Sequence, residues 1–264
     1  MNWDIFKMEI RRTRMGLIVW CAATACLAGM GMLEYPVIGT HADLVGQSLT
    51  LIPKLGQIVF GVYGPSLNDP LGYFAVMAYW CGLIIFTHAM YAGASAVAKE
   101  NRDGTAEYLF TMPCGRREIV WAKILAVLFN IFIMGIVNTV VNVMSMTAIT
   151  SEPAVFGSVL LACLGMFFMQ CLIAALGLLC SSLFKTYRTG VMLAAAVLVI
   201  SYCLMFALQY YDMPALNYIS PLAFFGAWDV AENGISLIYV LLAAVVVGVC
   251  LFGTQLIYSR REMR

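Results

Sequence analysis

The amino-acid sequence predicts an all-α integral membrane protein with six transmembrane helices and both termini in the cytoplasm. Three observations lead to this prediction. Of the 264 residues, 62% are hydrophobic and 11% are charged, whereas globular domains are about 25% charged. Six long apolar runs follow one another, and a span needs about 20 mostly apolar residues. Fourteen of the fifteen Lys and Arg residues fall in segments that six spans would place on one side.

The whole chain, residues 1–264, is predicted to form one transmembrane domain. We place the spans at about 15–33, 71–98, 119–150, 154–184, 189–211 and 235–259. Positive residues cluster at 7–14, 99–123, 185–188 and 260–264, and only Lys54 falls on the other side. Because loops rich in Lys and Arg stay in the cytoplasm, both termini are expected there, as an even number of spans requires.

The residues before the first span have an amphipathic pattern. Trp3, Phe6 and Ile10 share one helical face, while Lys7 and Arg11 share another. This pattern predicts an N-terminal interfacial helix, lying in the inner membrane interface. The alternative is a simple basic segment that leads into the first span.

Two segments on the outer side have patterns of their own. The outer loop at 34–70 contains a stretch, 48–63, in which apolar residues recur at helical spacing, and Pro53 falls where a first turn accepts proline. We predict a short helix there, on the outer leaflet or capping a cavity, with an irregular lid as the alternative. The aromatic-rich segment 212–232 predicts a short re-entrant or interface-lying piece.

The longest polar interval on the predicted cytoplasmic side is 99–123, which holds nine of the 29 charged residues. Asp103 is a good N-cap residue, Glu107 can reach back to the first turn, and Pro113 disfavours continuation of a helix. We therefore predict a short cytoplasmic coupling helix at about 103–113, between spans two and three. It either docks on a soluble partner or rests on lipid head groups. Its bulky apolar residues are Tyr108, Leu109 and Phe110.

Several residues of this interval form a pattern, and an apolar helix entered at Lys123 follows them. The residues are Glu100, Gly104, Thr105, Glu107, Leu109, Pro113 and Arg116. The pattern resembles the signature of the type-two ABC permeases, the membrane subunits of bacterial ABC exporters whose ATPases are separate chains. That family often has a serine before the arginine, and this chain has Gly115, a tolerated cap residue. The resemblance extends to 52–64, the tyrosine-rich second span and 218–230, and so covers most of the chain.

In that family the interval is the coupling element that docks on the ATPase. The resemblance therefore implies a permease subunit of an ATP-driven ABC transporter, an exporter in the cell inner membrane. It also implies two copies of an ABC ATPase as partners, together with a second permease copy or a related permease. ATP and Mg²⁺ would bind in the ATPase and not in this chain. The implied ATPase-docking residues are Glu100, Gly104, Thr105, Glu107, Tyr108, Leu109, Phe110, Pro113 and Arg116.

Polar residues inside the predicted spans are candidates for a substrate pathway. Asn138, Asn142 and Ser145 form one stripe at helical spacing in the third span. Gln170 lies in the middle of the fourth span, and His88 lies in the second. Such groups either line a translocation path or hold helices together by hydrogen bonds, and both interpretations stand.

The motifs of several other protein classes are missing from the sequence. No G-x-x-x-x-G-K-[ST] P-loop occurs, so the chain is not expected to be an enzyme by itself. The two histidines, His41 and His88, form no HExxH motif, and no metal site is expected. The nine cysteines include no CxxC pair and are expected to pack as small apolar residues. A net charge of +1 gives no reason to expect nucleic acid as a partner.

The alternative function is an ion-gradient-driven secondary transporter or channel. Such proteins commonly place carboxylates or broken helices near the middle of the membrane. The charge-free runs contain no carboxylate, and His88 is their one titratable candidate beyond cysteine and tyrosine. Transport that persists without ATP and follows a proton or sodium gradient would favour this alternative.

Overall fold

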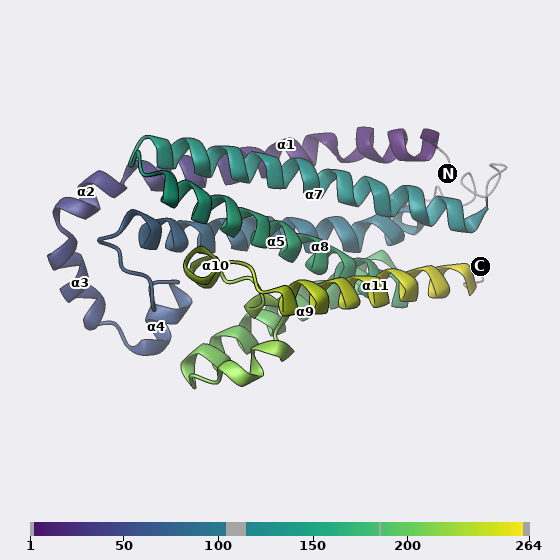
Figure 1. Cartoon of the computed structure of the whole chain (residues 1–264). Helices are drawn as coiled ribbons and strands as arrows, with labels where there is room; N and C mark the ends of the chain where they lie inside the picture. Colours follow the sequence, from purple (N-terminus) through teal and green to yellow (C-terminus); the bar gives the residue numbers. More distant parts are fainter. Residues whose placement is uncertain (1–2, 104–114, 185, 261–264) are drawn as a thin grey trace.

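The computed structural model describes residues 3–103, 115–184 and 186–260. Within these ranges the regular elements are helices and no strand occurs. Six of the helices are long and apolar enough to cross a membrane, which confirms the predicted all-α class with six such helices. Figure 1 shows them running roughly alongside one another. They are α1 (Trp3–Leu33), α5 (Pro70–Asp103), α7 (Arg116–Thr147), α8 (Pro153–Leu183), α9 (Tyr187–Tyr210) and α11 (Leu237–Arg260).

Helix α8 organises the bundle, because it packs against α5, α7, α9 and α11. Its closest neighbour is α5, and two glycines allow the approach. A Cβ atom on Gly93 of α5 would overlap the carbonyl of Ala174, and one on Gly177 of α8 would lie 2.6 Å from the carbonyl oxygen of Met90. Small residues at such a contact let two backbones pack directly, which is a common basis of helix association in membranes.

The N-terminal residues differ from the prediction of a separate interfacial helix. They form the first turns of α1, which is continuous from Trp3 to Leu33. Ile5 is buried with Ile119 and Ala122 of α7, and the carboxylate of Glu9 lies 3.6 Å from the Lys123 ammonium. These contacts hold the first turns of α1 along α7, so these residues form part of one continuous helix and not a separate one.

The connections opposite the chain ends contain the short helices. Between α1 and α5 lie α2 (Tyr35–Thr40), α3 (Ala42–Thr50) and α4 (Lys54–Val59). The stretch 48–63 thus holds a short helix, α4, that begins directly after Pro53, because the residue before a proline is disfavoured in a helix. Between α9 and α11 lie two 3₁₀ turns, η1 (Pro214–Ile219) and η2 (Pro221–Ala223), followed by α10 (Ala227–Asn233).

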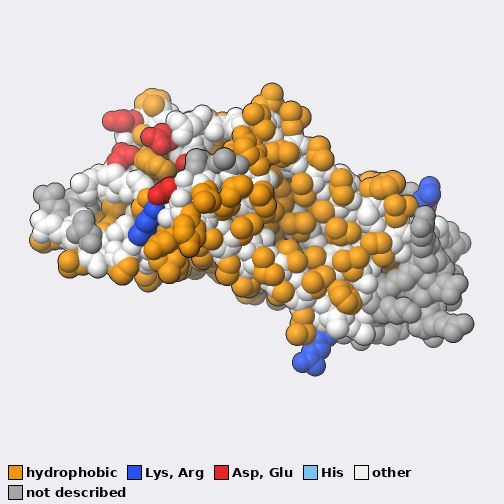
Figure 2. All heavy atoms as spheres, turned by 90° about the horizontal axis from the view of Figure 1, so that it is seen from below, with side chains coloured by type: hydrophobic (Ala, Val, Ile, Leu, Met, Phe, Trp, Pro, Cys, Tyr) orange, Lys and Arg blue, Asp and Glu red, His pale blue; other side chains and the backbone are white. Residues whose placement is uncertain are grey.

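The two ends of the bundle carry different charges. Trp3 of α1 and Arg260 of α11 lie at one end, which we call the terminal end, and α2, α3, α4 and α10 lie toward the opposite, distal end (Figure 1). Figure 2 shows acidic side chains gathered at the distal end. In the connecting segments at this end, Lys54 is the one Lys or Arg in the sequence. That the terminal end faces the cytoplasm stays a prediction from the positive residues.

The predicted coupling helix at 103–113 falls in the segment that joins α5 to α7. Of its residues, 104–113 lie outside the described part of the chain, so the prediction is untested. Helix α5 extends to Asp103, and α7 begins at Arg116 with Gly115 as its N-cap, in an extended conformation and without a side-chain cap.

Candidate functional site

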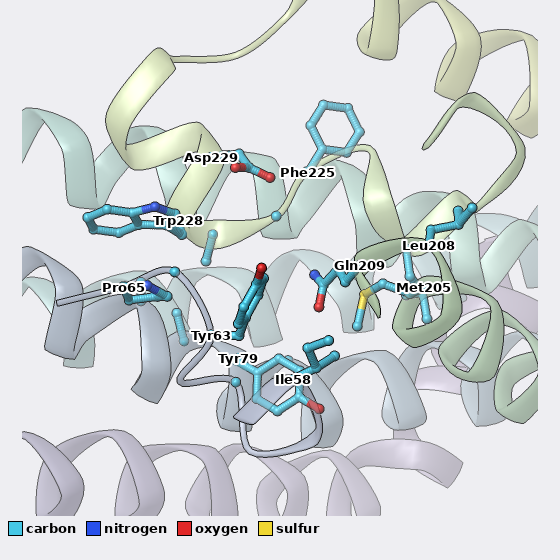
Figure 3. A pocket seen from close by; sticks show the side chains of 18 of the residues that line it. Ile58, Tyr63, Pro65, Tyr79, Met205, Leu208, Gln209, Phe225, Trp228 and Asp229 are labelled. Carbon is cyan, nitrogen blue, oxygen red and sulfur yellow. The ribbon is translucent and has the colours of Figure 1, made fainter. Parts of the chain in front are cut away.

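A cavity of about 580 Å³ lies toward the distal end of the bundle. Ligand pockets in proteins commonly enclose about 300–1,000 Å³, so its size suits a small organic molecule. Its walls come from the outer loop, from α5 and α9, and from the segment that leads into α10. Figure 3 shows Tyr63, Gln209 and Trp228, which come from three of these elements, around the same space. We call this cavity the distal pocket.

The outer loop is shaped into a wall of the distal pocket by the way in which α4 ends. The amide of Val62 bonds to the carbonyl of Gln57, and the amide of Gly61 bonds to the carbonyl of Ile58, a Schellman motif. The motif needs a left-handed residue, and Gly61 has φ +72°. A Cβ atom at Gly61 would also lie 2.5 Å from the ring of Tyr79. The Tyr79 hydroxyl donates to the Val59 carbonyl at 2.9 Å and fixes the loop on α5.

Helix α9 ends in the same motif, with an aspartate at the left-handed position. The amide of Met213 bonds to the carbonyl of Leu208, and the amide of Asp212 bonds to the carbonyl of Gln209. Asp212 has φ +49°, the one positive φ at a non-glycine residue in the described ranges. Aspartate visits this conformation more readily than most residues, and here its carboxylate is directed toward the outer loop.

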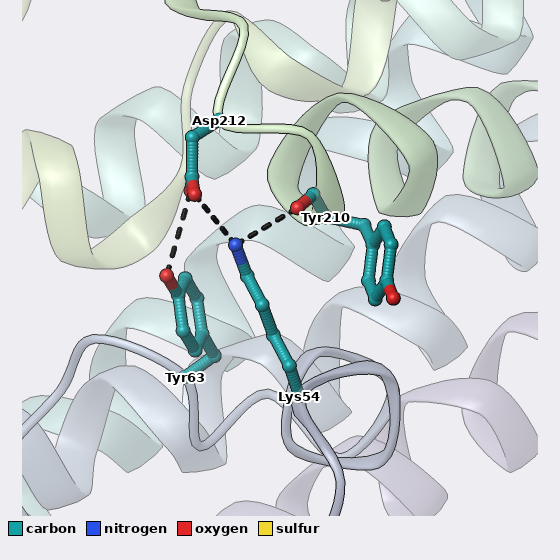
Figure 4. Close-up of polar contacts among 4 residues, drawn as sticks. All are labelled: Lys54, Tyr63, Tyr210 and Asp212. Carbon is teal, nitrogen blue, oxygen red and sulfur yellow. Dashed lines mark hydrogen bonds and ion pairs between the residues drawn. The ribbon is translucent and has the colours of Figure 1, made fainter.

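Lys54, the first residue of α4, joins the outer loop to the end of α9, as Figure 4 shows. Its ammonium donates to the Asp212 carboxylate at 2.6 Å and to the carbonyl of Tyr210 at 2.8 Å. The Tyr63 hydroxyl donates to the other Asp212 oxygen at 3.4 Å. We call these contacts the distal latch. The hydrogen bond with Asp212 is the largest cause that raises the pKa of Lys54, and desolvation acts in the opposite direction.

Aromatic rings make up much of the remaining wall of the distal pocket. Tyr79 and Phe86 come from α5, Tyr202 from α9, and Phe225 and Trp228 from the segment around α10. The Tyr202 hydroxyl is buried, and none of the described residues forms a hydrogen bond with it.

One carboxylate of the wall lies outside the latch. Asp229 is in the first turn of α10 and lines the distal pocket. Its pKa is raised, first because neighbouring groups displace water from the carboxylate and second because Glu232 is near. A carboxylate with a raised pKa gains from a positive charge placed beside it.

The predicted pathway residues lie elsewhere in the bundle, and none of the five lines the distal pocket. Asn138 and Asn142 are buried together in α7, where the Asn142 amide nitrogen donates to the Asn138 carbonyl at 2.7 Å and to its side-chain oxygen at 3.1 Å. The Asn138 amide nitrogen lies 3.8 Å from the sulfur of Met166, and Met166 lines the distal pocket. The amide pair is therefore one side chain away from the pocket wall.

The other three candidates are not joined to this pair by a bond in the described ranges. His88 is buried in α5, with its ring centroid 5.7 Å from that of Trp20 in α1. Gln170 is fully buried in α8, and its amide atoms have no hydrogen-bond partner among the residues that the structure describes. Ser145 is half-buried in α7. Whether these residues line a path or hold helices together stays open.

Most of the predicted ATPase-docking residues cannot be placed. Gly104, Thr105, Glu107, Tyr108, Leu109, Phe110 and Pro113 lie outside the described residues. Glu100 belongs to the last turn of α5, and Arg116 is the first residue of α7. The docking surface as a whole stays a prediction.

The distal pocket itself was missed by the sequence reasoning, although its parts were visible. Its walls use the stretches 52–64 and 218–230 and the tyrosine-rich second span, which carried the family resemblance. A further signal was Lys54, the one basic residue on its side of the predicted membrane. No pattern in the sequence showed that these stretches meet.

Comparison with known proteins gives one finding on the family. The model of a family described as ABC-2 family transporter protein matches residues 3–243, which is most of the chain and includes every wall of the distal pocket. The comparison with curated proteins returns no match.

Proposed function

Because the chain belongs to the ABC-2 transporter family, and is therefore a multi-pass membrane subunit of an ABC transporter, we propose that it is the permease of an ATP-driven exporter. In this proposal the chain resides in the cell inner membrane and docks on a separate ABC ATPase. Two ATPase copies and a second permease, identical or related, complete the assembly. ATP and Mg²⁺ bind in the ATPase, and this chain performs no chemistry itself.

The observation that best supports the proposal is the position of the distal pocket. It lies toward the end of the bundle opposite the segment expected to dock on the ATPase, and its walls come from α5, α8 and α9 together with the distal loops. A cavity between helices is a usual site for a transported molecule. We propose that it is the outward part of the pathway, with the Asn138–Asn142 pair behind Met166.

The helices give a mechanical connection between the two ends. Helix α5 enters the docking segment and α7 leaves it, while α5 also forms a wall of the distal pocket. At the terminal end, Lys123 of α7 donates to the carbonyl of Ala96 in α5 at 2.6 Å and pairs with Glu9 of α1. A movement of the docked ATPase would therefore shift α1, α5 and α7 together and change the pocket through α5.

The experiment is capture of the partner ATPase by variants of the docking segment. Glu107→Arg and Leu109→Asp should abolish capture and ATP-dependent transport, because each would bury an unpaired charge at a cost of several kcal/mol, about a thousandfold or more in affinity. If the segment docks as proposed, its docking face would be exposed to water in the free chain, and both variants should melt like the wild type. Glu152→Arg, an exposed charge reversal in the turn between α7 and α8, is the matched control.

Two results would contradict the proposal. Normal capture and transport in both docking variants would show that the segment is only a connector. Transport that needs no ATP and follows a proton or sodium gradient would instead support a secondary transporter.

A further inference from the structure

The charge at the distal end is strongly one-sided. The carboxylates there outnumber the basic side chains, and Figure 2 shows one basic side chain beside them. That residue is Lys54, which is already paired with Asp212 in the distal latch. Among the side chains that the structure describes, the acidic residues of this end are Glu34, Asp69, Glu152, Asp212, Asp229 and Glu232.

Asp229 brings this negative charge to the distal pocket itself. It lines the pocket, and no described Lys or Arg lies within ion-pair distance of it. Glu232, one turn further along α10, adds a second negative charge close to Asp229 and contributes to its raised pKa. Because the charges of Lys54 and Asp212 cancel, Asp229 and Glu232 leave a net negative charge at the distal pocket. That charge attracts cations and repels anions.

The walls beside Asp229 are aromatic and apolar. Trp228 precedes it in α10, and the rings of Tyr63, Tyr79 and Phe225 face the same pocket (Figure 3). Aromatic faces carry partial negative charge and bind organic cations, with tryptophan the most effective. Ile58, Met205 and Leu208 add aliphatic surface, which suits an apolar body more than a hydrated ion.

A bare metal ion fits this pocket poorly. The described residues contain no group of three or more His, Cys, Asp or Glu side chains that could hold one. The polar groups are instead spread around a volume of about 580 Å³, which matches an organic molecule. The buried Tyr202 hydroxyl adds a hydrogen-bonding group to the wall.

We propose that the distal pocket binds an organic cation with an apolar body, with its charge near Asp229 and its body between Trp228 and the tyrosine rings. The proposal rests on the proposed function, because it names the class of molecule that the permease would handle at its outward end. Neither the family match nor the docking segment specifies this class.

The test uses the purified full chain in nanodiscs and the probe tetraphenylphosphonium, with triphenylphosphine oxide as a neutral aromatic comparison. Binding to empty nanodiscs is subtracted. The cation should bind about tenfold more tightly than the neutral compound, because charge attraction and cation–π contacts both favour it. Equal binding of the two compounds, or no binding of the cation, overturns the proposal.

Variants locate the binding site. Asp229→Asn should weaken cation binding about fivefold to tenfold and leave the neutral compound unchanged. Trp228→Leu should weaken cation binding, and Trp228→Phe should restore part of it, because an aromatic face is kept. Glu152→Gln, a charge loss at the same end but outside the pocket, should change binding by less than about twofold. Cation binding that is unaltered by Asp229→Asn and by Trp228→Leu overturns the proposal.

Cation binding and ATPase capture test different proposals, so each can fail without the other. Cation binding in a chain that captures no ATPase would support the ligand class and contradict the ATP-driven permease. ATPase capture with ATP-dependent transport, together with absent cation binding, would contradict the ligand class alone.

Discussion

Two ion pairs at opposite ends of the bundle use the same chemistry in different surroundings. At the terminal end, Lys123 and Glu9 lie 3.6 Å apart, and their side chains are 0% and 5% exposed. At the distal end, Lys54 and Asp212 lie 2.6 Å apart, and their side chains are 33% and 66% exposed. Each lysine also donates to a backbone carbonyl, of Ala96 and of Tyr210 respectively. The pairs differ chiefly in how much water reaches them.

That difference decides what each pair can do. Once the Glu9–Lys123 pair has formed, loss of one partner leaves a buried charge, which typically costs about 3–5 kcal/mol. An exposed pair such as Lys54–Asp212 contributes little to stability, because water and salt screen it. We therefore expect the buried pair to hold α1, α5 and α7 as one unit beside the docking segment. The distal latch, by contrast, is expected to add little to the stability of the bundle and to hold only the outer loop against the end of α9.

The largest expected effect comes from breaking the buried pair on one side only. Lys123→Met leaves the Glu9 carboxylate buried and removes the donor to the Ala96 carbonyl. We expect the free energy of unfolding to fall by about 3–5 kcal/mol, and Tm by about 10 °C. The double variant Glu9→Gln, Lys123→Met should regain at least half of that loss. Unchanged melting of the single variant would place this pair in the same class as the distal latch.

The buried pair also shows how far the sequence alone could go. The six long helices follow from hydropathy, because an apolar run of about 20 residues is typical of a transmembrane helix. Lys123, however, falls both in the polar interval 99–123 and in the predicted third span, and neither assignment predicts that it is buried against α1 and α5. Its partner Glu9 is more than a hundred residues away in the chain, and the periodicity of one helix does not tell which other helix packs against it.

The candidate site was less predictable than the fold, because the sequence does not show which distant segments pack together. Each wall of the distal pocket is short, and the walls meet only through tertiary contacts such as Lys54–Asp212. A left-handed turn at Gly61 could be guessed from glycine, whereas the one at Asp212 could not, because aspartate more often caps a helix at its beginning. The ATPase-docking residues differ from the distal pocket in this respect. Their sequence pattern predicts a function, but most of them lie outside the described residues.

The second prediction tests whether the shape of the outer loop matters more than the latch that holds it. Gly61→Ala places a side chain at φ +72° and directs its Cβ atom toward the ring of Tyr79. We expect a loss of about 1–3 kcal/mol in the free energy of unfolding, measured by thermal melting. Gly157→Ala, at a helical glycine of α8 with open space around it, is the matched control and should be neutral or stabilising. Equal melting of both variants would show that the outer loop has no fixed conformation.

The third prediction concerns the distal latch itself. Lys54→Met and Asp212→Asn should each lower Tm by much less than Lys123→Met does, because the pair is exposed. Both should nevertheless speed hydrogen exchange in residues 54–64, which the latch holds against the end of α9. Protection in 116–147 should be unaltered. A loss of stability as large as that of Lys123→Met would contradict the proposed difference between the two pairs.

The smallest expected effect is the response of the latch to pH. The hydrogen bond with Asp212 raises the pKa of Lys54 above the ordinary lysine value of about 10.4. A group whose pKa is raised on folding contributes stability that is fully present below its unfolded pKa and is lost as the pH rises through its folded pKa. The latch should therefore stay closed through the neutral range and open only in strongly alkaline solution.

This response can be measured on the lysine itself, since the chain has only five lysines. With ¹³Cε-labelled lysine, the NMR signal that Lys54→Met removes identifies Lys54, and its titration gives the pKa directly. We expect a midpoint above that of an exposed lysine, and a return toward the ordinary value in Asp212→Asn, which keeps the left-handed backbone while removing the charge. A Lys54 midpoint at or below the ordinary value in the wild type would mean that the ammonium is not held by Asp212, and the distal end would then have no latch to compare with the buried pair.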